Sequence, residues 1–263
     1  MDRRRLLALV HRVWVTAGIA VTVIFVGWSL VAYRAAPAAR RASRPDGAVA
    51  VRHADGIWDF TPARGAPAPT VALVFFPGAL VDPVAYAPLA RAAAEAGFPA
   101  HIVELPRRGA FGGAEDPALW ARLRTVRGRA EAPRRWVVAG HSRGGVVASQ
   151  VAARGDDGLA GLVLVGTSHP RDVDLSGLTV PVTKVVGTRD GLATRGEVEA
   201  NRHLLPAATR WIWVEGGNHS QFGWYGFQPG DRRATIPAVA QRRQMLEAVL
   251  DMLRTAAAGD VSG

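Results

Sequence analysis

The 263-residue chain contains no cysteine, and Lys184 is the only lysine among its 32 basic residues. The absence of cysteine excludes a disulfide scaffold, a cysteine-ligated metal site and a cysteine nucleophile. The scarcity of lysine, beside 29 glycines and 17 prolines, is typical of a GC-rich coding bias, so single arginines carry little functional information. Hydrophobic residues make up 49% of the chain, which is enough for a sizeable buried core and excludes wholesale disorder.

The formal net charge of +10 is concentrated near the N-terminus. Residues 1–45 contain eight arginines and one acidic residue, Asp2, whereas the remaining 218 residues contain 24 basic and 21 acidic residues. A nucleic-acid-binding domain presents a basic stripe on its folded surface, and the nearly balanced part of the chain offers none. We therefore do not expect nucleic acid as a partner.

An uncharged apolar run covers residues 13–33. As a helix rising about 1.5 Å per residue, it would span the roughly 30 Å hydrocarbon core of a bilayer. Trp14 near one end, and Trp28 and Tyr33 near the other, suit the aromatic belts of membrane proteins. The run therefore predicts a transmembrane anchor, which would make this a single-pass protein of the cell membrane.

A cleaved signal peptide is a second interpretation of the same run, because residues 35–39 include small side chains suited to a peptidase. The apolar region of a signal peptide is usually shorter, about 7–15 residues, so we expect an uncleaved anchor. Arginines flank both ends of the run, and the orientation is close to a tie. We expect the domain outside the cytoplasm. The expected divisions are a basic tail (1–12), the anchor (13–33), a linker (34–47), the main domain (48–257) and a C-terminal tail (258–263).

Predicted strands and helices alternate after the linker. Asp55-Gly56 between two short apolar segments, 48–51 and 57–60, predicts a β-hairpin. Uniformly apolar runs bounded by Gly or Pro are typical of parallel strands buried on both faces; they lie at 71–76, 101–105, 136–139, 162–165, 182–186 and 211–214. Helices are expected at 84–96, 117–129, 145–154 and around 246–253. This alternation predicts an α/β fold with a mostly parallel, doubly wound sheet.

The sequence GHSRG at residues 140–144 is the strongest functional signal. It lies between a predicted strand and a predicted helix, which is the context of a nucleophile elbow. Its glycines remove side chains where a sharp turn would clash, and the turn would present the Ser142 hydroxyl near a helix N-terminus. We therefore predict Ser142 as a nucleophile. A dinucleotide-binding loop would need G-x-G-x-x-G, whose middle glycine is missing here.

A nucleophilic serine needs a base, and after a nucleophile elbow the acid and the histidine follow in that order, each on a loop after a strand. Asp190 follows the run 182–186 and is the predicted acid; Asp172 and Asp174 are less well placed rivals on the preceding loop. His219 follows the run 211–214 and is the predicted base.

Other histidines are less suitable, and His141, next to the nucleophile, is expected to point away. The predicted oxyanion donors are the backbone N–H groups of Arg143, which follows the nucleophile, and of Ala79, in the loop after the run 71–76. This chemistry implies no metal and no organic cofactor.

These motifs resemble the α/β-hydrolases, most closely the compact bacterial α/β-hydrolase fold-5 group, over residues 60–254. GHSRG resembles the shared elbow, and FFPG at 75–78, with Asp82 and Tyr86, resembles the oxyanion loop of that group. The most specific match is GGNHSQFGWYGFQ at 216–228. By resemblance, Ser142, Asp190 and His219 form a catalytic triad. Arg143 stands where relatives usually carry Leu or Met.

The segment between Gly166 and Val182 is too short for the helical lid that many lipases insert there, so we expect an open site without a large lid. Arg107 and Arg108 are expected at its mouth together with Arg143. They predict a preference for anionic esters, and a solvated basic loop is the alternative interpretation.

The sequence as a whole predicts a membrane-anchored serine hydrolase, resembling carboxylesterases, that cleaves small-molecule esters or related acyl compounds. Thioesterase, acyltransferase and peptidase activities use the same triad and remain alternatives. A non-catalytic, membrane-tethered binding module on a hydrolase scaffold is an alternative of another class. The sequence makes no prediction about the oligomeric state.

Overall fold

The computed structural model describes residues 3–63, 69–129, 133–155 and 158–259, and within these ranges eight strands form one sheet. Their order is β1-β2-β4-β3-β5-β6-β7-β8. Neighbours from β4 to β8 are parallel, whereas β1 pairs with β2, and β2 with β4, in antiparallel fashion. The predicted mostly parallel sheet with an N-terminal hairpin is therefore confirmed. The strands are β1 (Val49–Ala54), β2 (Ile57–Pro62), β3 (Val71–Phe76), β4 (Ala100–Val103), β5 (Arg135–His141), β6 (Leu159–Val165), β7 (Val182–Gly187) and β8 (Arg210–Val214).

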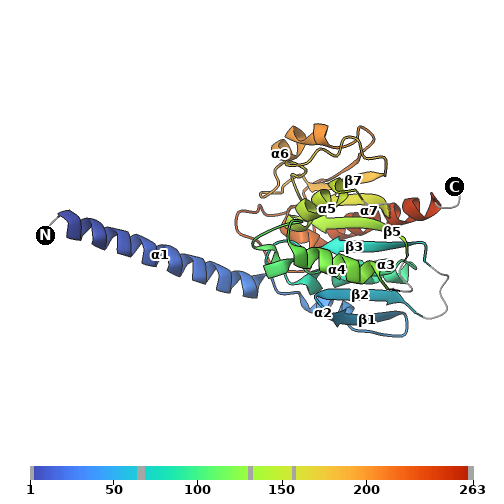
Figure 1. Ribbon diagram of the computed structural model, residues 1–263, viewed down its shortest axis with the longest axis horizontal. Helices are drawn as coiled ribbons and strands as arrows, with labels where there is room; N and C mark the ends of the chain where they lie inside the picture. Colours follow the sequence, from blue (N-terminus) through green and yellow to red (C-terminus); the bar gives the residue numbers. More distant parts are fainter. Residues whose placement is uncertain (1–2, 64–68, 130–132, 156–157, 260–263) are drawn as a thin grey trace.

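Helices cover both faces of this sheet (Figure 1). α3 (Ala87–Glu95) and α7 (Ala238–Ala258) pack on one face, and α4 (Pro117–Arg127) and α5 (Arg143–Ala153) on the other. All six residues of β3 are buried, and alternate side chains belong to the two separate hydrophobic clusters. A strand buried on both faces needs apolar residues at every position, which is why its sequence shows no polar alternation.

The structure places most predicted elements within a few residues. The expected helix at 84–96 is a short 3₁₀ turn, η1 (Pro83–Tyr86), followed by α3. α5 begins two residues earlier than predicted, directly after Ser142. α6 (Arg195–Ala200) was not predicted, although Thr194 and Glu197 form a capping box at its start. The remaining short turns are η2 (Pro106–Gly109), η3 (Arg202–Leu204) and η4 (Ser220–Phe222).

No helix forms in residues 167–181, between β6 and β7, so the absence of a large lid at this position agrees with the sequence prediction. Four residues of this loop, Thr167, Ser168, His169 and Arg171, form part of the lining of a cleft in the domain.

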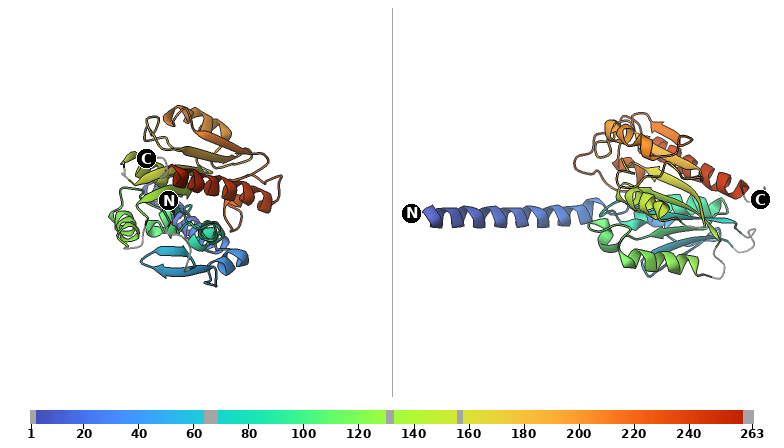
Figure 2. Two further views of the ribbon diagram at one scale, coloured as in Figure 1. Left: turned by 90° about the vertical axis from the view of Figure 1, so that its right-hand side faces the viewer. Right: turned by 45° about the horizontal axis from the view of Figure 1, so that its top comes forward.

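The N-terminal helix α1 (Arg3–Ala32) extends away from the domain (Figures 1 and 2). Its segment Arg3–Ser29 is long and apolar enough to cross a membrane, with a mean hydropathy of 1.9, and no residue of the 18-residue window that defines this segment is buried in the structure. The expected linker 34–47 contains a short helix, α2 (Pro37–Ala42), that packs on α3. Alanines allow this close approach, and Ala39 is completely buried.

Tyr33 also differs from expectation. Instead of lying at a lipid interface with Trp14 and Trp28, its side chain is buried in the domain core and packs edge-on against Tyr225, with ring centroids 5.9 Å apart. The domain therefore begins at the last turn of α1, without an extended spacer.

Asp116 caps α4, because its Oδ1 accepts a hydrogen bond from the Ala118 N–H at 2.9 Å. Asp116→Ala is expected to lower the free energy of unfolding by about 1 kcal/mol, the usual effect of losing such a cap. Urea denaturation measures the change. Glu247→Ala is the control, since this side chain forms only an exposed pair with Arg243 at 3.7 Å and should change stability by less than about 0.5 kcal/mol. Equal losses in the two variants would contradict the capping role.

Candidate active site

Ser142 lies at the sharp turn between β5 and α5, with φ 55° and ψ −120°. A positive φ is strained for a residue with a side chain and is tolerated where the surroundings enforce it. Here the surroundings are two glycines in close contact with backbone: a Cβ on Gly144 would overlap the Phe76 carbonyl oxygen, and one on Gly140 would overlap the Gly144 carbonyl. Only glycine fits these two positions, as the motif predicts.

Asp190 and His219 form a buried hydrogen-bonded pair. Asp190 Oδ2 lies 2.9 Å from His219 Nδ1, and the two side chains are 0% and 2% exposed. The other carboxylate oxygen, Oδ1, accepts from the backbone N–H groups of Leu192 and Ala193 at 2.8 and 2.7 Å. Because an ionised carboxylate only accepts hydrogen bonds, His219 Nδ1 carries the proton and Nε2 is left as the acceptor.

Ser142 and His219 line the same cleft, which has a volume of about 290 Å³. His219 Nε2 is buried and has no hydrogen-bond partner in the described part of the chain. No bond to Ser142 Oγ is formed in this conformation, and such bonds are often long in unliganded sites. The structure thus brings the three residues predicted as a triad to one edge of the sheet.

The rival acids lie elsewhere. Asp174 accepts a hydrogen bond from Ser176 N–H on the exposed loop after β6. Asp172 accepts from Gln150 at 2.6 Å, and its nearest histidine is His169, at 4.0 Å. Neither carboxylate contacts His219.

Two backbone N–H groups are available for an oxyanion. Those of Ala79 and Arg143 have no acceptor within the described ranges. The Ala79 loop is fixed on both sides: the Gly78 N–H donates to Tyr86 Oη at 3.2 Å, and the Leu80 N–H donates to the Arg108 carbonyl at 2.7 Å. Leu80 has a φ of 60°, a second strained position held by its surroundings.

Residues 72–243, more than half of the chain, match the family described as the alpha/beta hydrolase family. The chain belongs to this family. Comparison with curated protein sequences gives no match.

Solved structures share the fold of this alpha/beta hydrolase. Ferulic acid esterase from Streptomyces cinnamoneus has a TM-score of 0.60 and 22% identity, over 75% of this chain and 70% of the other. Esterase 2 from Thermogutta terrifontis, phosphoramylated by tabun, has a TM-score of 0.57 and 18% identity, over 80% and 96%. A membrane phospholipase A described as a bacterial virulence factor has a TM-score of 0.52 and 17% identity, over 96% and 99%.

His141 contradicts the expectation that it points away from the site. Its ring packs against that of His219, with centroids 4.6 Å apart, and its Nδ1 lies 2.7 Å from Tyr86 Oη. The same Tyr86 Oη accepts a hydrogen bond from Gly78 N–H in the loop that carries Ala79. Burial, followed by the positive charge of a protonated His219, lowers the pKa of His141 well below its ordinary value. His141 is therefore a neutral support between the oxyanion loop and the candidate base of this hydrolase.

Asp231 is a second supporting residue that the sequence did not reveal. Its carboxylate accepts from the N–H groups of Gly191 and His219 at 3.1 and 3.2 Å, and from Ser220 N–H and Oγ at 2.8 and 2.7 Å. It joins the loop that carries Asp190 to the loop that carries His219. Asp231 lies in an aperiodic Gly-rich stretch, where no sequence pattern predicts its partners.

The cleft contains basic residues, but not all of those predicted. Arg143 lines it, together with His169 and Arg171, which the sequence did not single out. Arg107 instead pairs with Asp116 at 2.9 Å. Arg108 lines a separate small hollow beside Pro77 and Gly78. The structure therefore does not bring Arg107 and Arg108 to the cleft.

The buried side chain of Lys184 contacts the loop that lines this cleft. Its Nζ donates to the backbone carbonyl of His169, and its side chain is buried in β7. Burial, and then the nearby charge of Arg171, lowers the pKa of Lys184 to about 7.

Residues 3–63, 69–129, 133–155 and 158–259 contain no group of three or more His, Asp or Glu side chains that could hold a metal ion.

Asp231→Ala is expected to lower kcat for ester hydrolysis by about 10- to 100-fold, because losing the hydrogen bonds that its carboxylate accepts from both loops frees these loops to shift relative to each other. Steady-state kinetics on a 4-nitrophenyl ester measures this effect. Asp251→Ala is the control, since its exposed carboxylate pairs only with surface arginines. If Asp231→Ala turned over at the rate of the control, the positioning role would be wrong.

Proposed function

We propose that this alpha/beta hydrolase is a serine hydrolase that cleaves carboxylic esters through Ser142, His219 and Asp190. The observation that carries the proposal is the buried Asp190–His219 pair at the cleft where Ser142 occupies a strained turn. The similarity in fold to two esterases and a phospholipase also supports an ester-cleaving enzyme.

In the proposed reaction, His219 Nε2 takes the proton from Ser142 Oγ as the oxygen attacks the ester carbonyl. The N–H groups of Ala79 and Arg143 stabilise the oxyanion. The tetrahedral intermediate collapses, the alcohol leaves with the proton from His219, and the acyl group stays on Ser142. Water, deprotonated by His219, then releases the acid and restores the serine.

Charge placement supports these roles. Asp190 is fixed by three hydrogen bonds and lies beside the imidazolium that forms during attack. The neighbouring His141 has a low pKa and adds no opposing positive charge at neutral pH.

We also propose that α1 anchors the enzyme in the cell membrane as a single span within Arg3–Ser29, with the hydrolase domain outside the cytoplasm; Tyr33, expected at the end of the span, belongs to the domain core instead. The apolar segment of α1 supports this assignment. The match to a membrane phospholipase A covers 96% of this chain, which leaves too few residues to exclude α1. That protein's name supports a lipid ester as one candidate substrate.

Ser142→Ala is expected to abolish covalent labelling by a fluorophosphonate probe, because the serine oxygen is the atom that would be phosphonylated. Labelling of purified, folded protein is read on a gel. Persistence of the label in Ser142→Ala would refute the assignment of the nucleophile. Absence of labelling in well-folded wild-type protein would favour the non-catalytic binding module.

Asp190→Asn is expected to reduce kcat by about 10⁴-fold, as loss of the orienting carboxylate does in such triads. Asp174→Asn, on the preceding loop, is expected to have little effect. The reverse order would move the acid to that loop. Parallel assays with esters, thioesters, peptides and competing alcohols separate the esterase from thioesterase, peptidase and acyltransferase activities.

Arg143 is proposed to favour substrates with an anionic group. It lines the cleft, its guanidinium donates to the Gly112 carbonyl, and its Nε is buried without a partner in the part of the chain the structure describes. Arg143→Met keeps the backbone N–H and should lower kcat/KM for an ω-carboxylated 4-nitrophenyl ester about tenfold relative to the neutral ester of equal length. Arg108→Met, outside the cleft, should leave this ratio unchanged. An unchanged ratio in Arg143→Met would remove the proposed preference.

A further inference from the structure

The last turn of α1 is hydrogen-bonded directly to the two loops that frame the cleft. The Ala32 carbonyl accepts from Gly226 N–H at 3.0 Å, in the loop after His219. The Tyr33 carbonyl accepts from Asp82 N–H at 3.0 Å, in the loop that carries Ala79. Ala36 N–H donates to the Trp224 carbonyl at 2.7 Å. Both loops follow parallel strands, so α1 joins the domain at the carboxyl edge of the sheet, where Ser142 also lies.

The direction of α1 is therefore set by the domain. Figures 1 and 2 show it extending away from this edge as a single unbroken helix. Backbone hydrogen bonds and the buried Tyr33 leave no flexible spacer between helix and domain. A flexible tether would allow the cleft any orientation relative to α1. This junction instead fixes the carboxyl edge of the sheet as the edge of the domain that faces the surface α1 enters.

Exposed large hydrophobic side chains gather at the same edge. Within the described ranges, and apart from α1, they are Phe111, Leu192, Phe227 and Val239, between 39% and 74% exposed. Single exposed hydrophobic residues are ordinary on a protein surface; their confinement to one edge is the informative observation.

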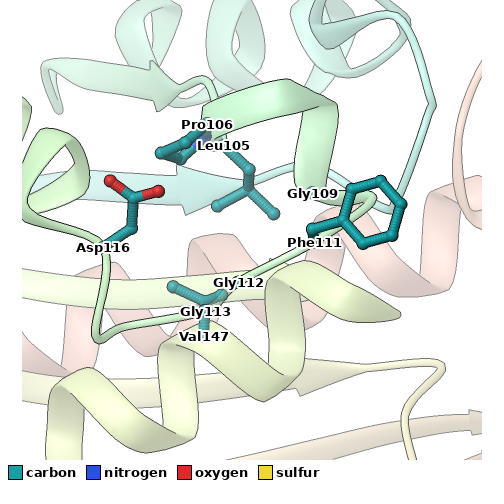
Figure 3. A pocket seen from close by; sticks show the side chains of 8 residues that line it. All are labelled: Leu105, Pro106, Gly109, Phe111, Gly112, Gly113, Asp116 and Val147. Carbon is teal, nitrogen blue, oxygen red and sulfur yellow. The ribbon is translucent and has the colours of Figure 1, made fainter.

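Three of the four lie on loops that follow parallel strands, and Val239 lies in the first turn of α7. Phe111 follows β4 and lies on a loop lining a small hollow, shown in Figure 3. Leu192 follows β7 and lines the cleft itself, and Phe227 is next to Gly226. Val239 is the second residue of α7, whose first turn is hydrogen-bonded to the histidine loop through Gln241 and Asn218. We call these four residues the rim.

We propose that the rim rests against the bilayer crossed by α1, so that the cleft opens toward the lipid and takes an acyl ester resident in that bilayer. The inference rests on the proposed ester hydrolysis and on the proposed anchor. The apolar segment of α1, at about 1.5 Å per residue, matches a bilayer with its headgroup regions, roughly 40–45 Å. The carboxyl edge then lies at headgroup level.

Positive charge near the junction between α1 and the domain is also suited to a membrane surface. Arg34, Arg40 and Arg41 are exposed just after α1, where they would meet lipid phosphates. Arg143 and Arg171 add positive charge inside the cleft. Together with the open loop at 167–181, these groups favour an ester whose alcohol part carries an anionic headgroup.

The absence of cysteine allows a direct test with the full-length protein reconstituted in phosphatidylcholine–phosphatidylglycerol vesicles. Phe111→Cys and Phe227→Cys each carry one fluorescent label, and Ala96→Cys and Ala208→Cys, exposed residues at the opposite edge, serve as matched controls. Nitroxide-bearing lipids should quench the label at 111 and 227 and leave it unquenched at 96 and 208. Equal quenching at all four sites, or none at the rim sites, would overturn the proposal.

A kinetic test uses the double variant Phe111→Ser/Phe227→Ser and two substrates. Hydrolysis of a phospholipid acyl ester in the vesicles should fall about tenfold, because apolar area is no longer available to the bilayer, whereas hydrolysis of soluble 4-nitrophenyl acetate should be unchanged. Equal rates of lipid hydrolysis in variant and wild type, or equal losses of rate on both substrates, would contradict the proposed contact between the rim and the bilayer.

Two controls distinguish failure of this inference from failure of the proposed anchor and of the proposed nucleophile. Vesicle flotation reports whether α1 inserts at all, and fluorophosphonate labelling reports whether Ser142 is reactive. A protein that floats and is labelled, but whose rim sites are unquenched, refutes the membrane-facing cleft alone. A protein that fails to float refutes the anchor, and the proposed rim with it.

Discussion

The backbone of Gly144 lies so near the Phe76 carbonyl that a Cβ at this position would overlap the carbonyl oxygen, and this close approach constrains the whole candidate site. It presses the first turn of α5 onto the end of β3, so that the loop after β3 and the turn after β5 meet. Arg143 and Ala79, whose amides are the candidate oxyanion donors, belong to these two segments, as do the two residues with positive φ, Ser142 and Leu80. A side chain at 144 would separate these loops, and the strain at Ser142 would then have nothing to maintain it.

Hydrogen bonds, rather than apolar packing, position the two loops that carry Asp190 and His219. Asp190 and Asp231 are both acceptors for several backbone N–H groups, and each therefore orders the loop around it. His141 has a pKa lowered well below its ordinary value and is therefore neutral. Its ring packs beside that of His219 without competing for the proton of Ser142. The two histidines differ in their partners: a carboxylate for His219 and a hydroxyl for His141.

The sequence was sufficient for features that depend on local geometry or strand order. Buried parallel strands need continuous apolar runs, and the elbow needs two glycines, so both were predictable; the fold and the family agree with that prediction. Asp190 and His219 follow from their positions after strands, and the structure brings them together with Ser142. His141, Asp231 and Arg171 were missed because their roles depend on partners tens of residues away, such as Tyr86 for His141. Arg107 and Arg108 were misplaced because both have left-handed backbone, which no local pattern indicates, and because Arg107 pairs with Asp116 and Arg108 lines a separate hollow.

The junction at residues 32–36 bears on whether α1 is retained. Cleavage within residues 35–39 would remove the carbonyl partners of Gly226 and Asp82 and expose the face of Tyr225 that Tyr33 covers. Unpaired N–H groups near a buried surface are unfavourable, and here they would lie in the loops that carry the candidate base and an oxyanion donor. A removable signal peptide would not be expected to contribute core contacts to the mature domain. This junction therefore favours an uncleaved anchor, in which the end of the helix is part of the framework that positions the site.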